Sequence, residues 1–80
     1  MTVVKVRLFA ALRELARGSE VDAAGTTAGE VLDDLCSRYG ERFARVARAG
    51  SIVVDGERAD ADRSLTGSEE VAILPPVSGG

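Results

Sequence analysis

The 80-residue sequence contains no histidine and no tryptophan, and it has one cysteine, one tyrosine and two phenylalanines. Without histidine the chain lacks the usual general base and the commonest protein ligand of metal ions. Metal clusters and Ser–His or Cys–His nucleophile systems are therefore not expected. Because Cys36 is alone, no disulfide can form within the chain, which agrees with a reducing compartment.

Long apolar runs and an excess of positive charge are also missing. No stretch is apolar for long enough to span a bilayer, and the chain enters strand-like alternation at its start without a signal-peptide pattern. The 13 acidic residues outnumber the 10 basic ones, and no basic stripe is interleaved with aromatics. We therefore expect a cytoplasmic protein that binds neither membranes nor nucleic acid.

The first half of the chain predicts a strand, a short helix, a second strand and a longer helix. A chain of this length forms one domain with a single modest core. Residues 10–17 favour a short helical turn, and a second strand is expected around residues 19–23. Segment 3–9 alternates, so one face carries apolar side chains and the other a mixed set: Val4, Val6 and Leu8 against Lys5, Arg7 and Phe9.

A capping box marks the start of the longer helix. Thr27 and Glu30 have the spacing at which a hydroxyl and a carboxylate each accept a hydrogen bond from a backbone N–H of the first turn. The apolar residues that follow recur at three-and-four spacing, which indicates one buried stripe up to Gly40, where a left-handed cap would end the helix. A shorter helix over residues 41–49 should place Phe43 and Val46 on one side.

The remaining segments predict three more strands. Residues 51–54 form a strand, Asp55-Gly56 is a strong two-residue hairpin signal into residues 57–60, and residues 70–74 make the last strand. The order is typical of an α+β, β-grasp (ubiquitin-like) fold, with a mixed sheet of about five strands and one main helix across one face. In that arrangement the first and last strands are parallel neighbours in the middle of the sheet.

The sequence ends in Leu74-Pro75-Pro76-Val77-Ser78-Gly79-Gly80, and this segment is the most informative of the chain. Proline ends a strand and favours an extended chain, so residues 1–74 are expected to form the domain and residues 75–80 a projecting tail of roughly 20 Å. Because glycine has no side chain, the reacting group of such a tail would be the carboxylate of Gly80. The alternative is an idle terminus.

Two stretches resemble the small subunit of molybdopterin synthase, a member of the ubiquitin-like sulfur carrier family. They are residues 6–15, which read VRLFAALREL, and residues 70–80, which read EVAILPPVSGG. The second is the more specific, because Pro-Pro-Val followed by a small residue and Gly-Gly is a narrower pattern than Gly-Gly alone. The resemblance extends over nearly the whole chain.

The resemblance implies a carrier that performs no catalysis alone and holds no cofactor. An ATP-dependent, ubiquitin-activating-like adenylyltransferase would adenylate the Gly80 carboxylate, and sulfur would then replace AMP. The resulting thiocarboxylate would enter the large subunit of molybdopterin synthase and donate sulfur to the pterin precursor of the molybdenum cofactor. A free carboxyl has a pKa of about 3.5 and is unreactive at neutral pH, which explains the need for activation.

Strand parity predicts an exposed apolar patch at the root of the tail. Phe9 falls on the face opposite Val6, and Leu74 falls on the same outward face of the neighbouring last strand. We expect both to dock partners, together with Arg13 of the first matching stretch. The alternative is that residues 12–15 fold over the patch and cover it.

Other features leave several functions open. Cys36 could carry a persulfide, but its place in the apolar stripe favours a core residue. The arginines at 38, 42, 45 and 48, or the acidic C-terminal half, could contact partners. Related carriers serve thiamine, cysteine or thiolated-tRNA synthesis, a protein modifier would join lysines through isopeptide bonds, and an interaction module would keep an inert tail.

Overall fold

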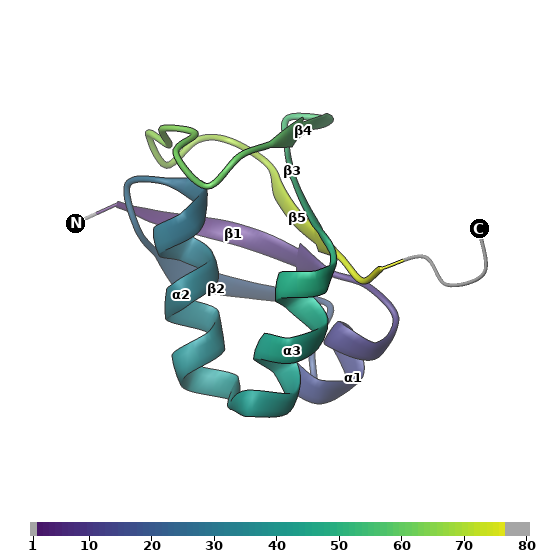
Figure 1. Ribbon diagram of the computed structural model, residues 1–80. Helices are drawn as coiled ribbons and strands as arrows, with labels where there is room; N and C mark the ends of the chain where they lie inside the picture. The colour runs from purple at the N-terminus through teal and green to yellow at the C-terminus, as the bar shows by residue number, and fades with distance from the viewer. Residues whose placement is uncertain (1, 77–80) are drawn as a thin grey trace.

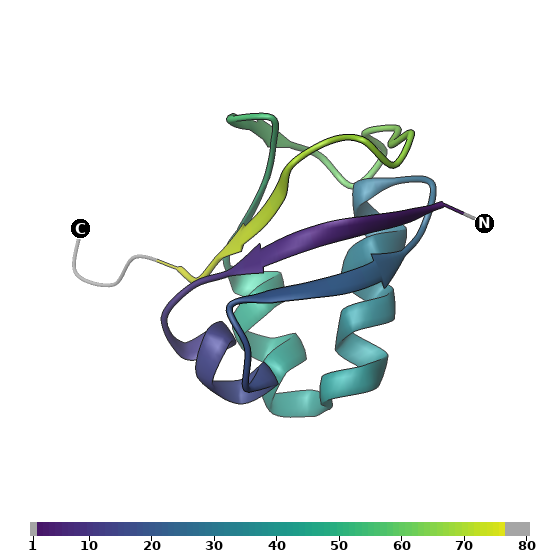
Figure 2. The same ribbon diagram turned by 180° about the vertical axis from the view of Figure 1, so that it is seen from behind.

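The computed structural model describes residues 2–76 as one five-stranded sheet with three helices against one face, as Figures 1 and 2 show from opposite sides. Figure 2 shows the other face of the sheet, which we call the outer face, without helices. The α+β, β-grasp prediction is therefore confirmed. The strands are β1 (Val3–Leu8), β2 (Glu20–Ala24), β3 (Ser51–Val54), β4 (Glu57–Ala59) and β5 (Val71–Leu74), and the helices are α1 (Ala11–Ala16), α2 (Ala28–Tyr39) and α3 (Glu41–Ala49).

The strand order in the sheet is β2-β1-β5-β3-β4. β1 and β5 are parallel neighbours, with Val6 opposite Val71 and Leu8 opposite Ile73, as predicted for the first and last strands. β1 pairs antiparallel with β2, and β3 pairs antiparallel with both β5 and β4. The chain therefore leaves the sheet from its central strand.

The core lies between the sheet and the helices. Val4, Val6 and Leu8 are at most 2% exposed, while the alternate side chains of β1 are exposed, so the predicted register of this strand is confirmed. Each helix contributes at least one fully buried side chain, because each presents one apolar stripe to the sheet. In α3 the structure buries Ala47 beside Phe43, and the predicted partner Val46 is only half-buried.

The capping box of α2 differs from its prediction by one residue. The Thr27 hydroxyl accepts from the Glu30 N–H at 3.2 Å, as expected. The Glu30 carboxylate, however, accepts from the backbone N–H of Thr26 at 2.7 Å and from its hydroxyl at 2.8 Å. These two bonds lower the pKa of Glu30, because they stabilise its ionised form. Gly40 ends the helix with a positive φ of 94°, but its ψ of −176° lies outside the left-handed helical region, so the predicted left-handed cap is not formed.

The β3–β4 hairpin has the two-residue turn that Asp55-Gly56 predicts. Both residues have positive φ, 50° and 84°, as a turn that matches the twist of the strands requires. Asp55 also ties the hairpin to the start of β5, since its carboxylate accepts from the Glu70 N–H at 2.9 Å. Four strands are slightly shifted or shorter than predicted: β1 ends at Leu8, β2 starts at Glu20, β4 ends at Ala59 and β5 starts at Val71.

The free edge of β2 is occupied by side chains of α2. The Ala24 N–H, which points away from β1, donates to the Asp34 carboxylate at 3.0 Å. Arg38 donates to the carbonyl oxygen of Asp22 on the same edge. The two side chains are four residues apart on α2, and their charged groups lie 4.0 Å from each other. Two of the edge groups that an additional strand would pair with, the Ala24 N–H and the Asp22 carbonyl, are therefore already satisfied.

The loop before β5 is organised by Glu69. Its carboxylate accepts hydrogen bonds from the Thr66 N–H at 2.9 Å, from the Gly67 N–H at 3.0 Å and from the Thr66 hydroxyl at 3.1 Å. These bonds require the ionised carboxylate and lower the pKa of Glu69 to about 2, chiefly through the backbone N–H of Thr66.

We predict that this loop makes folding stability dependent on acid pH. Because the pKa of Glu69 is lower in the folded chain than the ordinary 4.5, the carboxylate contributes stability above pH 4.5. That contribution is lost as the pH falls from 4.5 towards 2. Glu69→Gln should therefore lower the free energy of unfolding at pH 6 and have little effect near pH 2, as measured by urea denaturation. Glu57→Gln is the control, since the Glu57 carboxylate accepts no hydrogen bond from any group within residues 2–76.

No helix among residues 2–76 combines the length and apolar character that crossing a membrane requires. In the same residues no three acidic or cysteine side chains converge as a metal site would need.

Candidate functional site

The candidate site lies where β5 ends and the chain leaves the sheet. Leu74 is the last residue of β5, and Pro75 and Pro76 follow without regular structure. The predicted tail residues Val77, Ser78, Gly79 and Gly80 lie outside the described residues. The proposed reacting group is therefore not part of the geometry below, which concerns the root of the tail.

A tight turn after β1 keeps Phe9 at the surface. Ala10 has a φ of 51° and a ψ of −125°, which is unusual for a residue with a Cβ and costs about 1–3 kcal/mol. The turn closes with a hydrogen bond from the Leu12 N–H to the Phe9 carbonyl oxygen at 3.1 Å. It sends Leu12 into the core, where it is fully buried, while Phe9 stays 41% exposed. Helix α1 therefore does not fold over Phe9.

Phe9 and Leu74 lie at the same end of two neighbouring strands. Leu8 is opposite Ile73 in the parallel pair. Phe9 directly follows β1 and Leu74 is the last residue of β5, so both lie at this end of the sheet and are exposed. Leu74 is 36% exposed, and it belongs with Phe9 to the three large apolar side chains that are exposed within residues 2–76. We call Phe9, Leu74 and the groove beside them the exit surface.

The groove of the exit surface has a volume of about 300 Å³ and brings Arg13 to the same place. It is formed by the end of β1, the start of α1 and the start of β2. The groove thus brings together Phe9 and Arg13, two of the three residues predicted to bind partners, while Leu74 is not part of its lining. The lining residues are Arg7, Leu8, Phe9, Arg13, Ser19 and Glu20.

Gly50 fixes the position of the tail root, although no sequence pattern singles it out. The residue follows α3 and lies against the backbone of Leu74 and Pro75. A Cβ on Gly50 would overlap the Leu74 carbonyl oxygen and lie 3.1 Å from the Pro75 Cα. Its φ of −94° is open to any residue, so the constraint is space alone. Any side chain at position 50 must therefore push the end of β5 away.

We predict that Gly50→Ala misplaces the tail. The overlap can be relieved only by moving the Leu74 carbonyl, at a cost of about 1–3 kcal/mol in folding stability. A shift of about 1 Å in a reacting group can reduce a rate about a hundredfold, so transfer from the tail should fall at least tenfold. The measurement is single-turnover sulfur transfer at 20 °C, with circular dichroism to verify that the variant is folded.

Gly18→Ala is the matched control for Gly50→Ala. A Cβ at position 18 would meet its nearest neighbour within residues 2–76, the Glu20 carbonyl oxygen, only at 3.9 Å, which is ordinary contact. It should leave both stability and transfer close to wild type. Equal transfer by the two variants would show that the close approach of Gly50 does not direct the tail.

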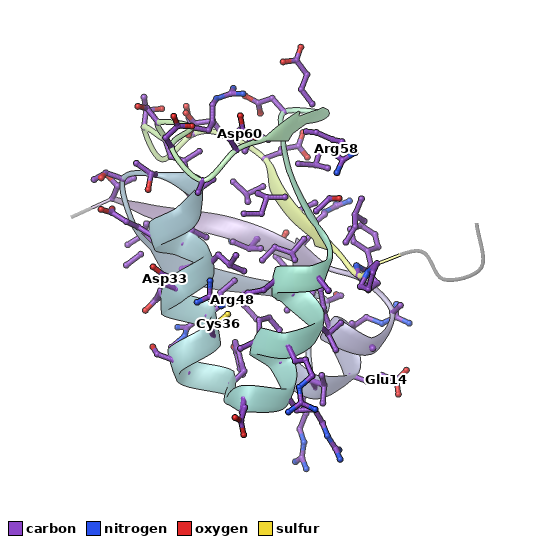
Figure 3. All side chains as sticks on the ribbon, in the orientation of Figure 1. Glu14, Asp33, Cys36, Arg48, Arg58 and Asp60 are labelled. Atoms are coloured by element: carbon purple, nitrogen blue, oxygen red, sulfur yellow. The ribbon has the colours of Figure 1, made fainter. Side chains whose placement is uncertain are left out.

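Cys36 is part of the core. It is 8% exposed and lies in the apolar cluster, and Figure 3 shows it close to Arg48 and Asp33 where α2 faces α3. Burial raises the pKa of the Cys36 thiol and outweighs the opposing effect of the Arg48 charge. The protonated thiol is a poor nucleophile, so the core interpretation is favoured over a persulfide.

Two of the four arginines on α2 and α3 have structural roles. Arg48 forms an ion pair with Asp33 at 2.8 Å, and Arg38 covers the edge of β2. Arg42 and Arg45 are exposed and form no ion pair within residues 2–76. Two acidic residues of the C-terminal half also have structural roles, since the carboxylates of Asp55 and Glu69 accept hydrogen bonds from backbone groups just before β5.

The exit surface combines exposed apolar side chains with a few polar groups. The polar groups of its groove are two arginines, a serine and one carboxylate. Such a surface can bind a protein and orient the tail towards it. The reaction itself would have to take place at the tail residues, outside the described part of the chain.

Comparison with known proteins identifies related sequences and structures. The model of the ThiS family matches residues 6–80. A molybdopterin synthase sulfur carrier subunit from Anopheles gambiae is 36% identical over 86 residues, which cover 96% of this chain and 91% of the relative.

Two solved structures share the fold over almost the whole chain. The small archaeal modifier protein 1 from Methanosarcina acetivorans has a TM-score of 0.81 and 32% identity, with 100% of this chain and 98% of that chain covered. A chain in the Amycolatopsis orientalis BexX/CysO complex has a TM-score of 0.77 and 28% identity, with 96% of this chain and 99% of that chain covered.

Proposed function

This chain belongs to the ThiS family, and on that premise we propose that it is a sulfur carrier that supplies molybdopterin synthase. The observation that carries the proposal is the 36% sequence identity to a molybdopterin synthase sulfur carrier subunit, over 96% of this chain. The terminal Pro75-Pro76-Val77-Ser78-Gly79-Gly80 supports it, because this segment provides an unhindered backbone and a carboxylate for activation.

The proposed reaction has two stages, both at Gly80. First, the Gly80 carboxylate attacks the α-phosphorus of ATP in the site of an adenylyltransferase, and pyrophosphate leaves. A sulfide-level nucleophile then attacks the acyl carbon and AMP leaves, so one oxygen of the carboxylate is replaced by sulfur. The chain itself binds no ATP in this proposal, and its role is to present the carboxyl group to each partner in turn.

The exit surface is proposed to dock these partners. Phe9 and Leu74 provide an apolar contact at the base of the tail, where a protein interface would bury both. The first partner is the adenylyltransferase and the second is the large subunit of molybdopterin synthase. Both partners can use the same docking surface, since the chain has one tail and only one partner can bind that tail at a time.

A second candidate function follows from the likeness to the small archaeal modifier protein 1. The same adenylated carboxyl group could be attacked by a lysine amine of another protein, which would give an isopeptide bond. The likeness to a chain of the BexX/CysO complex likewise keeps other sulfur-accepting pathways open.

The intact mass of the protein from its native cells tests the proposal. A carrier should show a fraction of molecules in which one oxygen of the C-terminal carboxyl group is replaced by sulfur. Incubation with the large subunit and the pterin precursor should return that fraction to the carboxylate. Conjugates of higher mass on a denaturing gel, without a thiocarboxylate, would favour the modifier instead.

A further inference from the structure

Arginines stand on both sides of the exit surface. On one side Arg7 and Arg13 line the groove next to Phe9. On the other side Arg58 of β4 donates to the Ser51 hydroxyl at 3.1 Å, and Ser51 is paired with Leu74. Figure 3 shows Arg58 at the β3–β4 side of the molecule. We call these three arginines the arginine collar.

The backbone register places Arg7 and Arg58 on the outer face. Arg7 is opposite Ala72 in the parallel pair, Ala72 is opposite Val53, and Val53 is opposite Arg58. Since opposite residues of paired strands point to the same face, one row crosses the sheet with an arginine near each end and small apolar residues between. The collar and the apolar centre therefore belong to one continuous surface.

The charge of the collar is not neutralised within the molecule. None of its three arginines forms an ion pair in the described range 2–76, and all three are exposed. The one carboxylate in the groove lining is that of Glu20, which is opposite Arg7 in the β1–β2 pair and lies 3.9 Å from the Lys5 ammonium. The exit surface is thus locally positive in a chain whose net charge is −3.

From this arrangement we infer that the exit surface selects a protein partner whose contact area has an apolar centre and a rim of aspartate or glutamate carboxylates. The inference rests on the proposed function, since it specifies the partner surface that receives the tail. The apolar centre needs an apolar counterpart, and the collar attracts carboxylates at its rim. A nucleic acid is disfavoured, because it would meet an apolar centre and an overall negative protein.

A rim of charges acts mainly on the rate of association. Opposite charges steer two proteins together before contact, and a substitution at the rim changes the association rate constant and its salt dependence. Because the Debye length falls from about 10 Å at 0.1 M salt to about 3 Å at 1 M, the contribution of the collar should disappear at high salt.

The test compares Arg58→Glu with Arg42→Glu, which cause the same change in net charge. Arg42 is exposed on α3, in the helical layer on the opposite side of the sheet, and forms no ion pair within residues 2–76. Stopped-flow association is measured with the large subunit of molybdopterin synthase from the same organism, at 0.05 M and 1 M salt. Thermal melts of both variants verify folding, and Arg58→Gln removes the charge while an amide remains to donate to Ser51.

We expect Arg58→Glu to slow association about tenfold at 0.05 M salt, Arg58→Gln to slow it less, and Arg42→Glu to leave it near wild type. At 1 M salt the variants should associate at the same rate as wild type. Equal slowing by Arg58→Glu and Arg42→Glu would overturn the inference, because net charge alone would then explain the rates. So would a wild-type rate that does not fall with salt, or binding of a DNA oligonucleotide that depends on Arg58.

The outcomes also separate this inference from the proposed function. If wild type binds the large subunit but the collar variants behave as wild type, the carrier role stands and the acidic rim is wrong. If wild type does not bind the large subunit and cells contain no thiocarboxylate, the proposed function is wrong and the inference fails with it.

Discussion

Deletion of Gly80 is expected to reduce sulfur transfer to the background level while leaving thermal unfolding unchanged. The deletion moves the terminal carboxyl group to Gly79, so the reacting group is withdrawn by about 3.3 Å, the length of one extended residue. A misplacement of 1 Å can already cost about a hundredfold in rate, and a threefold larger one leaves no productive geometry. Transfer is measured as molybdopterin formed per carrier in the reconstituted synthase.

The unfolding transition should not respond, because no described residue beyond Ile73 belongs to the buried core. Binding to the large subunit should also persist, since Phe9 and Leu74 remain in place. Retained transfer by the truncated protein would contradict the carrier function as a whole. Loss of binding together with transfer would instead show that the tail supplies most of the affinity.

Phe9→Asp and Val6→Asp should have different effects, although Val6 lies in β1 and Phe9 directly follows that strand. Phe9 is 41% exposed, so a carboxylate there stays hydrated in the free protein and folding stability changes little. In a complex it would be buried without a partner. We expect a loss of about 2 kcal/mol or more in binding, roughly a thirtyfold increase in Kd, by titration calorimetry.

Val6 is fully buried at the centre of the sheet, opposite Val21 and Val71. A carboxylate there must either remain ionised in an apolar core or take up a proton, and either costs several kcal/mol. Small domains have only about 5–15 kcal/mol of stability, so most Val6→Asp molecules should be unfolded at 25 °C by circular dichroism. If Phe9→Asp unfolds as readily, Phe9 contributes to the core and the exit surface does not bind as proposed.

The sheet and its register were predictable from the sequence because they depend on local alternation. β1 alternates over its whole length, so the pattern of apolar and polar residues is enough to assign its inward side chains. The same parity placed Phe9 and Leu74 on the outer face, and the parallel pairing of β1 with β5 then brought them together. Turn chemistry gave the hairpin at Asp55-Gly56, since few residue pairs adopt two positive φ angles.

Features that depend on distant contacts could not be predicted. Gly50 looks like an ordinary helix end, and its proximity to Leu74 arises only when β3 pairs with β5. The positive φ of Ala10 has no signal in an alanine-rich segment. In α3 both Val46 and Ala47 fit the spacing from Phe43, and the position of the neighbouring helices decides which one is buried. The arginine collar likewise forms only because β4 pairs with β3. The hairpin turn predicts that pairing, but the order of charges along the sequence does not show that Arg58 will face the same surface as Arg7.

The covered edge of β2 determines what kind of self-association is open to the folded chain. Asp34 and Arg38 occupy the groups of Ala24 and Asp22 that an incoming strand would need, so β4, three residues long, is the other edge of the sheet. Fibres grow when each molecule offers two complementary edges. Pairing at the obstructed edge of β2 would first require these two hydrogen bonds to break, so growth through both edges is disfavoured. The two charged side chains of α2 therefore protect the folded chain against strand addition at β2, which is a role in solubility and not in sulfur chemistry.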